Sequence, residues 1–425
     1  MIINTNPTTP SGINSTSITN LRDCAKSIDG NYFAIITTTA LEIYKKNGTG
    51  YTKLASPSNE SFLSRSGYFH YTGLCFSKDN QWLIAKVTGN TSDLLSQIIV
   101  YKNINDVFTK ITQTNIDPPM DTTEWATDQL LFNISETGTY VAVRTRYRYT
   151  SSGNEYTVIK LYKNNDGVLT TVWGIENLNG GLITSTTSMD FDGNKLYIGY
   201  NWWGKSYIDI YSITENTNNT TISLIPHTMF TELHNISFNS INIQFNYDRT
   251  FLYVNDATYF DRLIIYKKNI DDTFTAINVP SFTFPPGVNT SLVYSPKFLE
   301  IFPLNSNYFA TIINTSLSSS FSSKKVYFIL YRIEHTKIVI YNTIDLFSYT
   351  SQEAPLTIAL SLLGNNIFMK LRYQNDALTA DVYNNKVFAI TGQPPEIPPW
   401  VPTYSIRTGN FTLADQDLVI DINLL

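Results

Sequence analysis

The stretch that decides the fold is residues 41–54, which read LEIYKKNGTGYTKL. Three similar stretches follow it: IIVYKNINDVFTKI (98–111), VIKLYKNNDGVLTTV (158–172) and LIIYKKNIDDTFTAI (263–277). Each copy combines an alternating apolar segment, a polar turn of Asn, Asp or Gly, and a second segment rich in strand-forming residues. This pattern is typical of a β-hairpin. A hairpin is therefore the recurring element of the chain.

Two further segments precede each hairpin and recur with it. The first is a short apolar strand that ends in a turn such as Asp29-Gly30 or Asp79-Asn80. Asp, Asn and Gly tolerate the positive φ angles that tight turns need. The second segment is a strand led by an aromatic residue, as at Tyr32, Trp82 and Tyr140. Together with the hairpin, these segments give three to four strands per unit.

The tyrosine of the hairpin serves to count the units. It recurs at intervals of 49 to 65 residues, at Tyr44, Tyr101, Tyr162, Tyr211, Tyr266, Tyr331 and Tyr383. One such sheet cannot bury both of its faces, so neighbouring units must pack face to face around an axis. We predict an all-β fold, with a seven-bladed β-propeller over residues 21–391. Six or eight blades, or a pair of β-sandwiches, are the alternatives.

The segments outside the repeat have a different composition. Residues 1–20 form a polar N-terminal lead without periodicity, and residues 392–425 form a Pro-rich linker followed by a strand-like C-terminal arm. The arm carries Phe411, Leu418 and Ile420, and Trp400 precedes it as a candidate interface anchor. We expect the arm either to pack back on the propeller or to add a strand to a partner protein.

Composition and charge narrow the function classes. Aromatic residues make up 14% of the 425 residues and charged residues only 15%, which favours strands over the helices of a typical enzyme. The formal net charge of −5 argues against nucleic-acid binding, which usually requires a basic face. We also expect no membrane insertion and no signal peptide, because no apolar run is long enough and the first residues are polar.

The side chains that could support catalysis or metal binding are poorly placed for it. His227 and His234 are seven residues apart, without a Cys or carboxylate at a spacing that would complete a zinc site. Nearly all the Asp residues are expected in hairpin turns, where Asp caps backbone N–H groups. A glycosidase needs two carboxylates that face each other across a cleft. We therefore expect no enzyme, no cofactor and no metal, with calcium in an Asp-rich turn as a lesser alternative.

The two cysteines are expected to be structural. Cys24 and Cys75 are about one repeat apart, at what we interpret as equivalent positions on the first strands of two neighbouring blades. We predict two small buried residues rather than a disulfide.

An aromatic cluster is one candidate binding site. Trp202 and Trp203 are adjacent in a strand and therefore point to opposite faces, so at most one of them can pack between blades. Together with Tyr200, the other tryptophan would form an exposed aromatic surface for a sugar or a protein. Packing of both at a blade edge is the alternative.

A basic strand is the second candidate. Arg144, Arg146 and Arg148 alternate along one strand with uncharged residues, so they share one face. A solvated strand face is the simpler interpretation of this pattern, and a site for an anionic ligand is the other.

The whole cycle resembles a known repeat. In the first unit it reads Ser27-x-Asp29-Gly30-x-Tyr32-x-Ala34, followed by the Tyr-Lys hairpin of residues 41–54. This pattern is similar to the WD40-like propeller repeats of tailed-phage and prophage structural proteins, over roughly residues 21–390. The Gly-His and Trp-Asp dipeptides of eukaryotic WD40 repeats are absent.

The resemblance implies a role in a virion. It suggests a non-enzymatic structural or adhesion protein on the tail, neck or capsid surface, present in many copies in a symmetric assembly. Its loops would bind other virion proteins, or a glycan or protein of the host surface. A lectin-like carbohydrate-binding propeller and a glycan-cleaving propeller enzyme are the alternatives.

Overall fold

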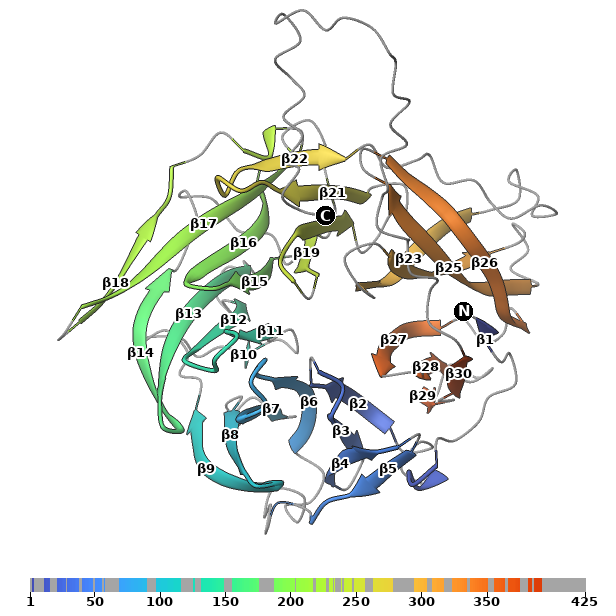
Figure 1. Cartoon of the computed structure of the whole chain (residues 1–425), viewed down its shortest axis with the longest axis horizontal. Coiled ribbons are helices and arrows are strands. Elements are labelled where there is room, and N and C mark those ends of the chain that lie inside the picture. The colour runs from blue at the N-terminus through green and yellow to red at the C-terminus, as the bar shows by residue number, and fades with distance from the viewer. Residues whose placement is uncertain are drawn as a thin grey trace, which may run out of the picture. The chain divides into compact units, whose positions relative to one another are not determined.

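The regular elements of the computed structural model are β-strands (Figure 1). The structure describes residues 2–3, 11–15, 21–57, 69–89, 97–115, 125–126, 131–148, 155–175, 187–256, 263–277, 294–316, 323–350, 355–374 and 381–391, with gaps of one to four residues inside some ranges. The chain divides into two compact units, Met1–Gly392 and Gln393–Leu425. The predicted arm, with Trp400, Phe411, Leu418 and Ile420, lies outside the described residues.

The described strands form seven antiparallel sheets, and six of these contain strands that follow one another along the chain. Blade 1 contains β2 (Leu21–Lys26), β3 (Tyr32–Thr37), β4 (Leu41–Asn47) and β5 (Gly50–Lys53). Blade 2 contains β6 (Phe69–Phe76), β7 (Trp82–Gly89), β8 (Gln97–Ile104) and β9 (Val107–Asn115). Blade 3 contains β10 (Trp125–Ala126), β11 (Leu131–Ile134), β12 (Tyr140–Arg148), β13 (Glu155–Asn165) and β14 (Val168–Ile175).

The next three blades repeat the same order. Blade 4 contains β15 (Ser188–Asp192), β16 (Lys195–Trp202), β17 (Lys205–Asn216) and β18 (Asn219–Leu224). Blade 5 contains β19 (Ile241–Phe245), β20 (Phe251–Asp256), β21 (Leu263–Lys268) and β22 (Phe274–Ile277). Blade 6 contains β23 (Tyr294–Pro303), β24 (Tyr308–Ser316), β25 (Ser323–Glu334) and β26 (Lys337–Thr350).

The seventh sheet departs from this order. It contains β27 (Pro355–Leu363), β28 (Asn366–Gln374), β29 (Asp381–Tyr383) and β30 (Lys386–Thr391), and both β29 and β30 pair with β28. The N-terminal strand β1 (Ile2–Ile3) pairs with β30 and so lies beside the last strand of the repeat region. Residues of the predicted polar lead thus take part in a sheet.

The sheets follow one another in a ring (Figure 1). The first strands of successive sheets, with β11 in place of the short β10 in blade 3, contact each other in the pairs β2–β6, β6–β11, β11–β15, β15–β19, β23–β27 and β27–β2. Blades 5 and 6 share a hydrophobic cluster that includes Tyr253 and Phe309. The predicted all-β β-propeller is confirmed. The predicted seven equivalent units are not, because the structure has six regular blades and a seventh sheet of different strand order.

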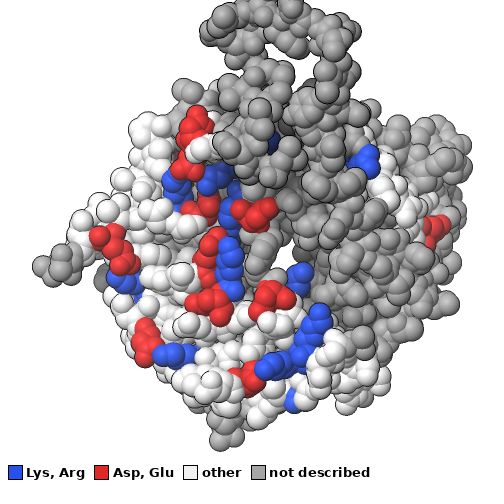
Figure 2. Space-filling view, in the orientation of Figure 1, with Lys and Arg blue, Asp and Glu red and all other residues white. Residues whose placement is uncertain are grey.

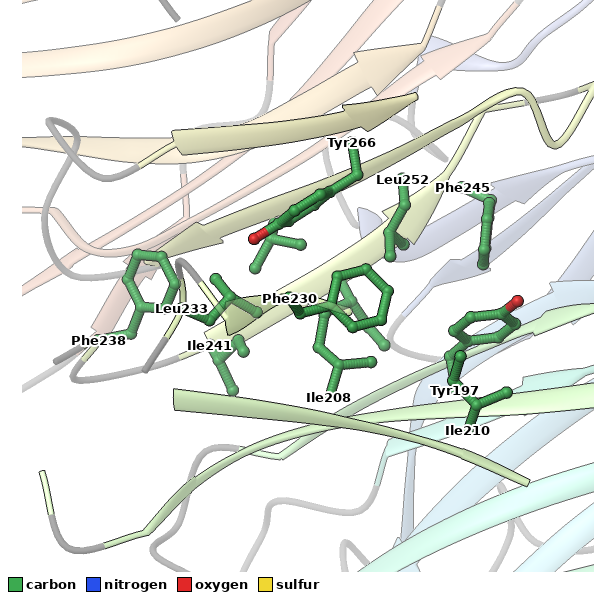
Figure 3. Close-up of a cluster of buried hydrophobic side chains, with 12 residues drawn as sticks. Tyr197, Ile208, Ile210, Phe230, Leu233, Phe238, Ile241, Phe245, Leu252 and Tyr266 are labelled. Atoms are coloured by element: carbon green, nitrogen blue, oxygen red, sulfur yellow. The ribbon is translucent and has the colours of Figure 1, made fainter. Parts of the chain in front are cut away.

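Hydrophobic side chains fill the space between successive blades. Figure 3 shows the cluster between blades 4 and 5, where Tyr197 and Ile210 of blade 4 meet Phe245 and Tyr266 of blade 5. Phe230, from the connection between the two blades, packs edge-on against Tyr266 with the ring centroids 4.9 Å apart. Full burial of a large apolar side chain contributes roughly 1.5–3 kcal/mol, so these clusters dominate the stability of the ring.

One position of the first strand supplies this packing in blade after blade. The residue that pairs with the second residue of the next strand is large and apolar, and it belongs to the cluster shared with the preceding blade. In blades 2 to 5 this residue is Phe76, Ile134, Phe191 and Phe245.

The same five-residue turn joins β2 to β3, β6 to β7, β11 to β12 and β19 to β20, in blades 1, 2, 3 and 5. Its first residue is Ser27, Ser77, Ser135 or Asn246, whose side-chain oxygen accepts a hydrogen bond from the N–H that starts the next strand. Its fourth residue has a positive φ and is Gly30, Asn80, Gly138 or Arg249. The predicted capping role of Asp is confirmed at Asp29, Asp79 and Asp248, which accept hydrogen bonds from backbone N–H groups two residues later.

The two cysteines are free and half-buried. Their predicted equivalence is wrong by one residue, because Cys24 pairs with Ile35 whereas Cys75 pairs with Ile84, the counterpart of Ala34. A shift of one residue turns a side chain to the other face of a sheet. Cys24 therefore packs on the cluster of blade 1, and Cys75 on the cluster between blades 2 and 3.

Gly30 and Gly138 occupy the same turn position, so replacing each by Ala distinguishes the cost of backbone strain from the cost of a steric clash. A Cβ added at Gly30 (φ 72°) would have no heavy atom within 4 Å, whereas at Gly138 (φ 71°) it would lie 2.2 Å from Cδ1 of Trp82. We expect Gly30→Ala to cost about 1–2 kcal/mol through the left-handed backbone alone. Gly138→Ala should cost roughly 1–3 kcal/mol more, because Trp82 of the neighbouring blade must move. Urea unfolding of both variants checks this, and equal losses would contradict the inter-blade contact.

Candidate functional site

The candidate site is a buried polar network centred on Arg249. This residue occupies the fourth position of the blade 5 turn with φ 62°, where the other turns carry Gly or Asn. A positive φ is rare for a residue with a long side chain and costs of order 1–3 kcal/mol. Such a conformation persists only where its surroundings enforce it, so Arg249 marks a place where its side chain matters.

The guanidinium of Arg249 joins three blades. Its Nε lies 3.1 Å from Oε1 of Glu136 in the blade 3 turn, and its Nη1 lies 3.3 Å from Oδ2 of Asp190 on β15 of blade 4. The group also lies over the ring of Phe245, 5.5 Å from its centroid. Arg249 is largely buried, and the pKa of its guanidinium is raised by Asp190 and Glu136 although burial alone would lower it. The cation is thus held by two carboxylates.

Glu136 extends the network to a fourth blade. Its Oε2 lies 3.3 Å from Nζ of Lys78, and its backbone oxygen accepts a hydrogen bond from the backbone N–H of Lys78 at 2.8 Å. Burial raises the pKa of the Glu136 carboxyl, but Arg249 and Lys78 outweigh it and the pKa is lowered. One chain of charges therefore links the inner turns of blades 2, 3 and 5 with the first strand of blade 4.

Asp190 is the buried end of this chain, and all of its acceptor positions are used. Oδ1 accepts hydrogen bonds from Nδ2 of Asn133 (3.0 Å) and from the backbone N–H of Phe191 (2.7 Å). Oδ2 accepts from the backbone N–H of Phe245 (2.7 Å) and from Arg249. Burial raises the pKa of Asp190, while Arg249 and these N–H donors oppose the rise. Since a carboxylate offers about four lone-pair positions, none remains for a substrate.

A second set of charges lies near the outer hairpin turns, and we name its members the rim ion pairs. In each, a lysine of one blade meets a carboxylate of the next blade. The pairs are Lys45–Asp106 (2.7 Å), Lys102–Asp166, Lys163–Glu215 (3.1 Å) and Lys195–Asp272 (2.9 Å). Figure 2 shows acidic and basic side chains next to one another over much of this face.

The aromatic residue that leads the second strand takes part in the same contacts. Tyr32 pairs across the sheet with Lys45, and its hydroxyl donates to Asp106 of blade 2. Tyr140 likewise donates to Glu215 of blade 4. In blade 2 the equivalent residue is Trp82, and Nζ of Lys102 lies 5.4 Å from its ring centroid. The aromatic and the lysine of one blade therefore bind the hairpin of the next blade together.

In blade 4 the lysine is on the second strand, at the position of the leading aromatic residue. Lys195 stands where the other blades carry the leading aromatic, and its cross-strand partner is Ser212 instead of a lysine. Lys195 still pairs with Asp272 of blade 5. The positive charge is thus retained although the sequence position has moved to the neighbouring strand.

The structure places the predicted candidate residues as follows. Tyr200 is 1% exposed, packs in the cluster between blades 3 and 4 and donates a hydrogen bond to Asp209 at 3.2 Å. It is a core residue, so its assignment to an exposed aromatic surface is wrong. Trp202 ends β16, its side chain is not among those described, and Trp203 lies outside the described residues.

The basic strand is partly inside the molecule. Arg144 is 3% exposed, and its Nη1 donates to the backbone oxygen of Thr187, which directly precedes β15 of blade 4, at 2.5 Å. The predicted solvated strand face is therefore wrong for Arg144, because its guanidinium lies between two blades. Arg146 and Arg148 belong to the same strand β12, and their side chains are not among those described.

Sequence reasoning missed the central network. Asp190 lies inside β15 and is buried, so it is not one of the carboxylates that cap a hairpin turn. One signal was available for Arg249: it follows Asp248 in the turn at the place where other repeats read Gly or Asn. The partners of Arg249 could not be found in this way, because they lie in other blades.

Two negative findings apply to the described part of the chain. It holds no group of three or more His, Cys, Asp or Glu side chains placed to bind a metal ion. It also contains no helix with the length and apolar character needed to span a membrane.

Of the comparisons with known proteins, only the one with solved structures finds similar chains. No family model matches the sequence, and no curated protein matches it either. Among solved structures, the chain is similar to the β-propeller domain of Myceliophteria thermophila Cps50 (Swd1), with 10% identity over 88% of this chain and 97% of that one and a TM-score of 0.46. Kluyveromyces lactis Hsv2 is similar at 8% identity over 87% and 98%, with a TM-score of 0.43.

A prolyl endopeptidase is similar at the same level. Its identity to this chain is 11%, the match covers 89% of this chain, and the TM-score is 0.46. The match spans about half of that enzyme, 52% of its length. These three likenesses give no link to phage proteins.

Replacing Arg249 tests whether the stabilisation by its ion pairs exceeds the energetic cost of its positive φ. Arg249→Gly relieves the positive-φ cost but leaves the buried Asp190 without its cation. We expect a net loss of roughly 2–4 kcal/mol, because breaking a buried ion pair costs more than the strain. The double variant Arg249→Gly/Asp190→Asn should recover part of this loss in thermal unfolding. Wild-type stability of Arg249→Gly would show that the network is dispensable.

The rim ion pairs predict a pH dependence. Lys45 and Tyr32 lower the pKa of Asp106, so its contribution to stability is complete above its unfolded pKa of about 3.9 and is lost as pH falls through the lower folded value. Asp106→Asn should therefore lower the thermal midpoint at pH 7. The difference from wild type should shrink as the pH falls below about 4.

The control for this experiment is Lys45→Met. If the pair is real, the double variant Lys45→Met/Asp106→Asn should lose less than the sum of the single variants. A pH-independent difference between wild type and Asp106→Asn would contradict the assignment.

Proposed function

We propose that the protein is a non-catalytic binding scaffold that serves as a structural or adhesion component of a phage particle. We infer the absence of catalysis from Asp190, because all the hydrogen-bond acceptor positions of its carboxylate are occupied. It is the most buried carboxylate of the central network, yet Asn133, Arg249 and two backbone N–H groups occupy its acceptor positions. A general base or nucleophile must keep a position open for its substrate.

The other charged groups of this face support the same proposal. Glu136 is bound by Arg249 and Lys78, and the carboxylates of the outer turns are bound by lysines of the preceding blade. These contacts hold one blade against the next. The charges therefore serve assembly of the scaffold, and binding falls to other surfaces.

Binding is assigned to the connections between blades. Blade 1 ends at Lys53 and blade 2 begins at Phe69, whereas β4 and β5 are separated only by a tight turn between Asn47 and Gly50. Because the strands alternate in direction, the connections between blades emerge at the end of the sheets opposite to these tight turns. Long connections on a rigid scaffold are the usual carriers of binding residues. Neighbouring virion proteins or a host-surface receptor would contact them.

The closure of the ring is part of the proposal. We infer that the seventh sheet completes the propeller as a seventh blade, with β1 as the strand that joins the two ends of the repeat region. A ring closed by both ends of its chain gives a particle component the rigidity that repeated use in a symmetric assembly requires.

The composition of purified particles tests the virion assignment. We expect quantitative mass spectrometry of phage particles from the producing host to find the protein at a fixed copy number relative to the major capsid protein. The matched control is a host protein of similar abundance, which should be lost during purification. Absence of the protein from intact particles would exclude this role.

A glycan array combined with a hydrolysis assay separates the alternatives. The scaffold proposal expects no release of sugar from any glycan on the array. Glycan binding without cleavage would identify the receptor as a carbohydrate, and cleavage would overturn the non-catalytic assignment.

A further inference from the structure

A charged residue replaces a core residue in blade 1. The first-strand position that packs against the preceding blade is apolar in blades 2 to 5, where it is Phe76, Ile134, Phe191 or Phe245. In blade 1 the residue in the same register is Lys26, which pairs with Phe33. An ammonium group therefore stands where the repeat otherwise places an aromatic ring or an isoleucine.

Lys26 faces the junction with the seventh sheet. It lies two residues after Cys24, so both side chains project from the same face of β2. Cys24 packs against Phe33, Tyr44 and the other members of the blade 1 cluster, on the face away from blade 2. The strand β2 contacts β27 and β28 of the seventh sheet.

The environment of Lys26 disfavours its charge. The residue is half-buried, and desolvation lowers the pKa of its ammonium group. Moving an ammonium group out of water is costly, because the protein interior does not fully replace its hydration.

The rim ion pair is missing from the sequence at the same junction. The tyrosines of blades 1, 2 and 3 are each followed by a lysine, as in Tyr44-Lys45. In the seventh sheet the residue in the same register is Phe388, which pairs with Ile367 of β28 and is followed by Ala389. The receiving turn of blade 1 reads Gly48-Thr49, where blade 2 has Asn105-Asp106. Both partners of the contact that joins blades 1 to 5 are thus replaced by uncharged residues.

Short N-terminal segments hold this junction instead. The two-residue strand β1 pairs with β30, and the backbone oxygen of Ser11 accepts a hydrogen bond from the backbone N–H of Tyr51 at 2.9 Å. Ile13 is buried in the blade 1 cluster. A two-residue strand contributes few hydrogen bonds, so it opens more easily than a full ladder.

We propose that the junction between blade 1 and the seventh sheet is a seam that opens locally while blades 3 to 5 stay closed, and that Lys26 sets how often it opens. The opening exposes Lys26 to water, where its charge is fully hydrated. The seam is a conformational device of the ring and does not depend on the proposed virion role.

Native-state hydrogen exchange of the full chain tests the seam. In the wild type we expect amides of β2, β28 and β30 to exchange about tenfold or more faster than amides of β16 and β20. Lys26→Leu restores an apolar residue at the repeat position. It should slow exchange at the seam by about tenfold and leave β16 and β20 unchanged.

The matched control is Phe76→Lys, which places a lysine at the equivalent position of blade 2. It should speed exchange of β6 and β3 at the junction of blades 1 and 2 and leave β16 and β20 unchanged. A second measurement needs no variant: in the wild type, an amine-reactive ester should label Lys26 at a rate that follows the exchange of β2.

Two results would overturn the proposal. One is a wild-type seam that exchanges as slowly as blades 3 to 5. The other is a Lys26→Leu variant whose seam exchanges at the wild-type rate or faster, which would show that Lys26 stabilises the junction through a partner in the seventh sheet.

Discussion

The whole structure depends on the burial of both faces of each sheet against its neighbours. A four-stranded blade such as β15–β18 has apolar side chains on both faces, and it finds cover only between two other blades. The large apolar residue of the first strand, Phe191 in this blade, carries much of that contact. Half-exposed ion pairs at a protein surface contribute about 0–1 kcal/mol each, so the rim pairs fix the register of blades that apolar packing already holds together.

This division explains why the Tyr-Lys dipeptide recurs. In the hairpin strand, Tyr44 and Tyr101 are buried, while the lysine after each reaches the carboxylate of the next blade. One dipeptide therefore makes both contacts: its tyrosine packs inside the ring, and its lysine forms the ion pair at the rim. Blade 4 shows that the requirement is the charge rather than the dipeptide: Ser212 replaces the lysine, and Lys195 on the neighbouring strand supplies the cation.

The sequence predicts the all-β propeller because the signals of this fold are local and repeated. Alternation of apolar residues and Asp-Gly turns lie within one unit, and the hairpin tyrosine recurs from unit to unit. These signals do not show that the seventh sheet departs from the strand order of the six regular blades. The candidate site is not predictable in this way. Arg249 and Glu136 are 113 residues apart, and only the ring brings their turns together. For the same reason the sequence pattern wrongly places Tyr200 and Arg144 at the surface, since a single strand does not show which neighbour covers it.

Departures from the repeat are the most informative residues of this chain, and the two described here act in opposite directions. Arg249 replaces Gly or Asn at a strained turn position, and two carboxylates compensate the strain by binding its guanidinium. Lys26 replaces a large apolar residue at a core position, and the sequence around it also lacks the rim pair. The first substitution ties blades 2 to 5 together, and the second weakens the place where the two ends of the ring meet. Stability is thus concentrated on one side of the ring, and local opening is directed to the other.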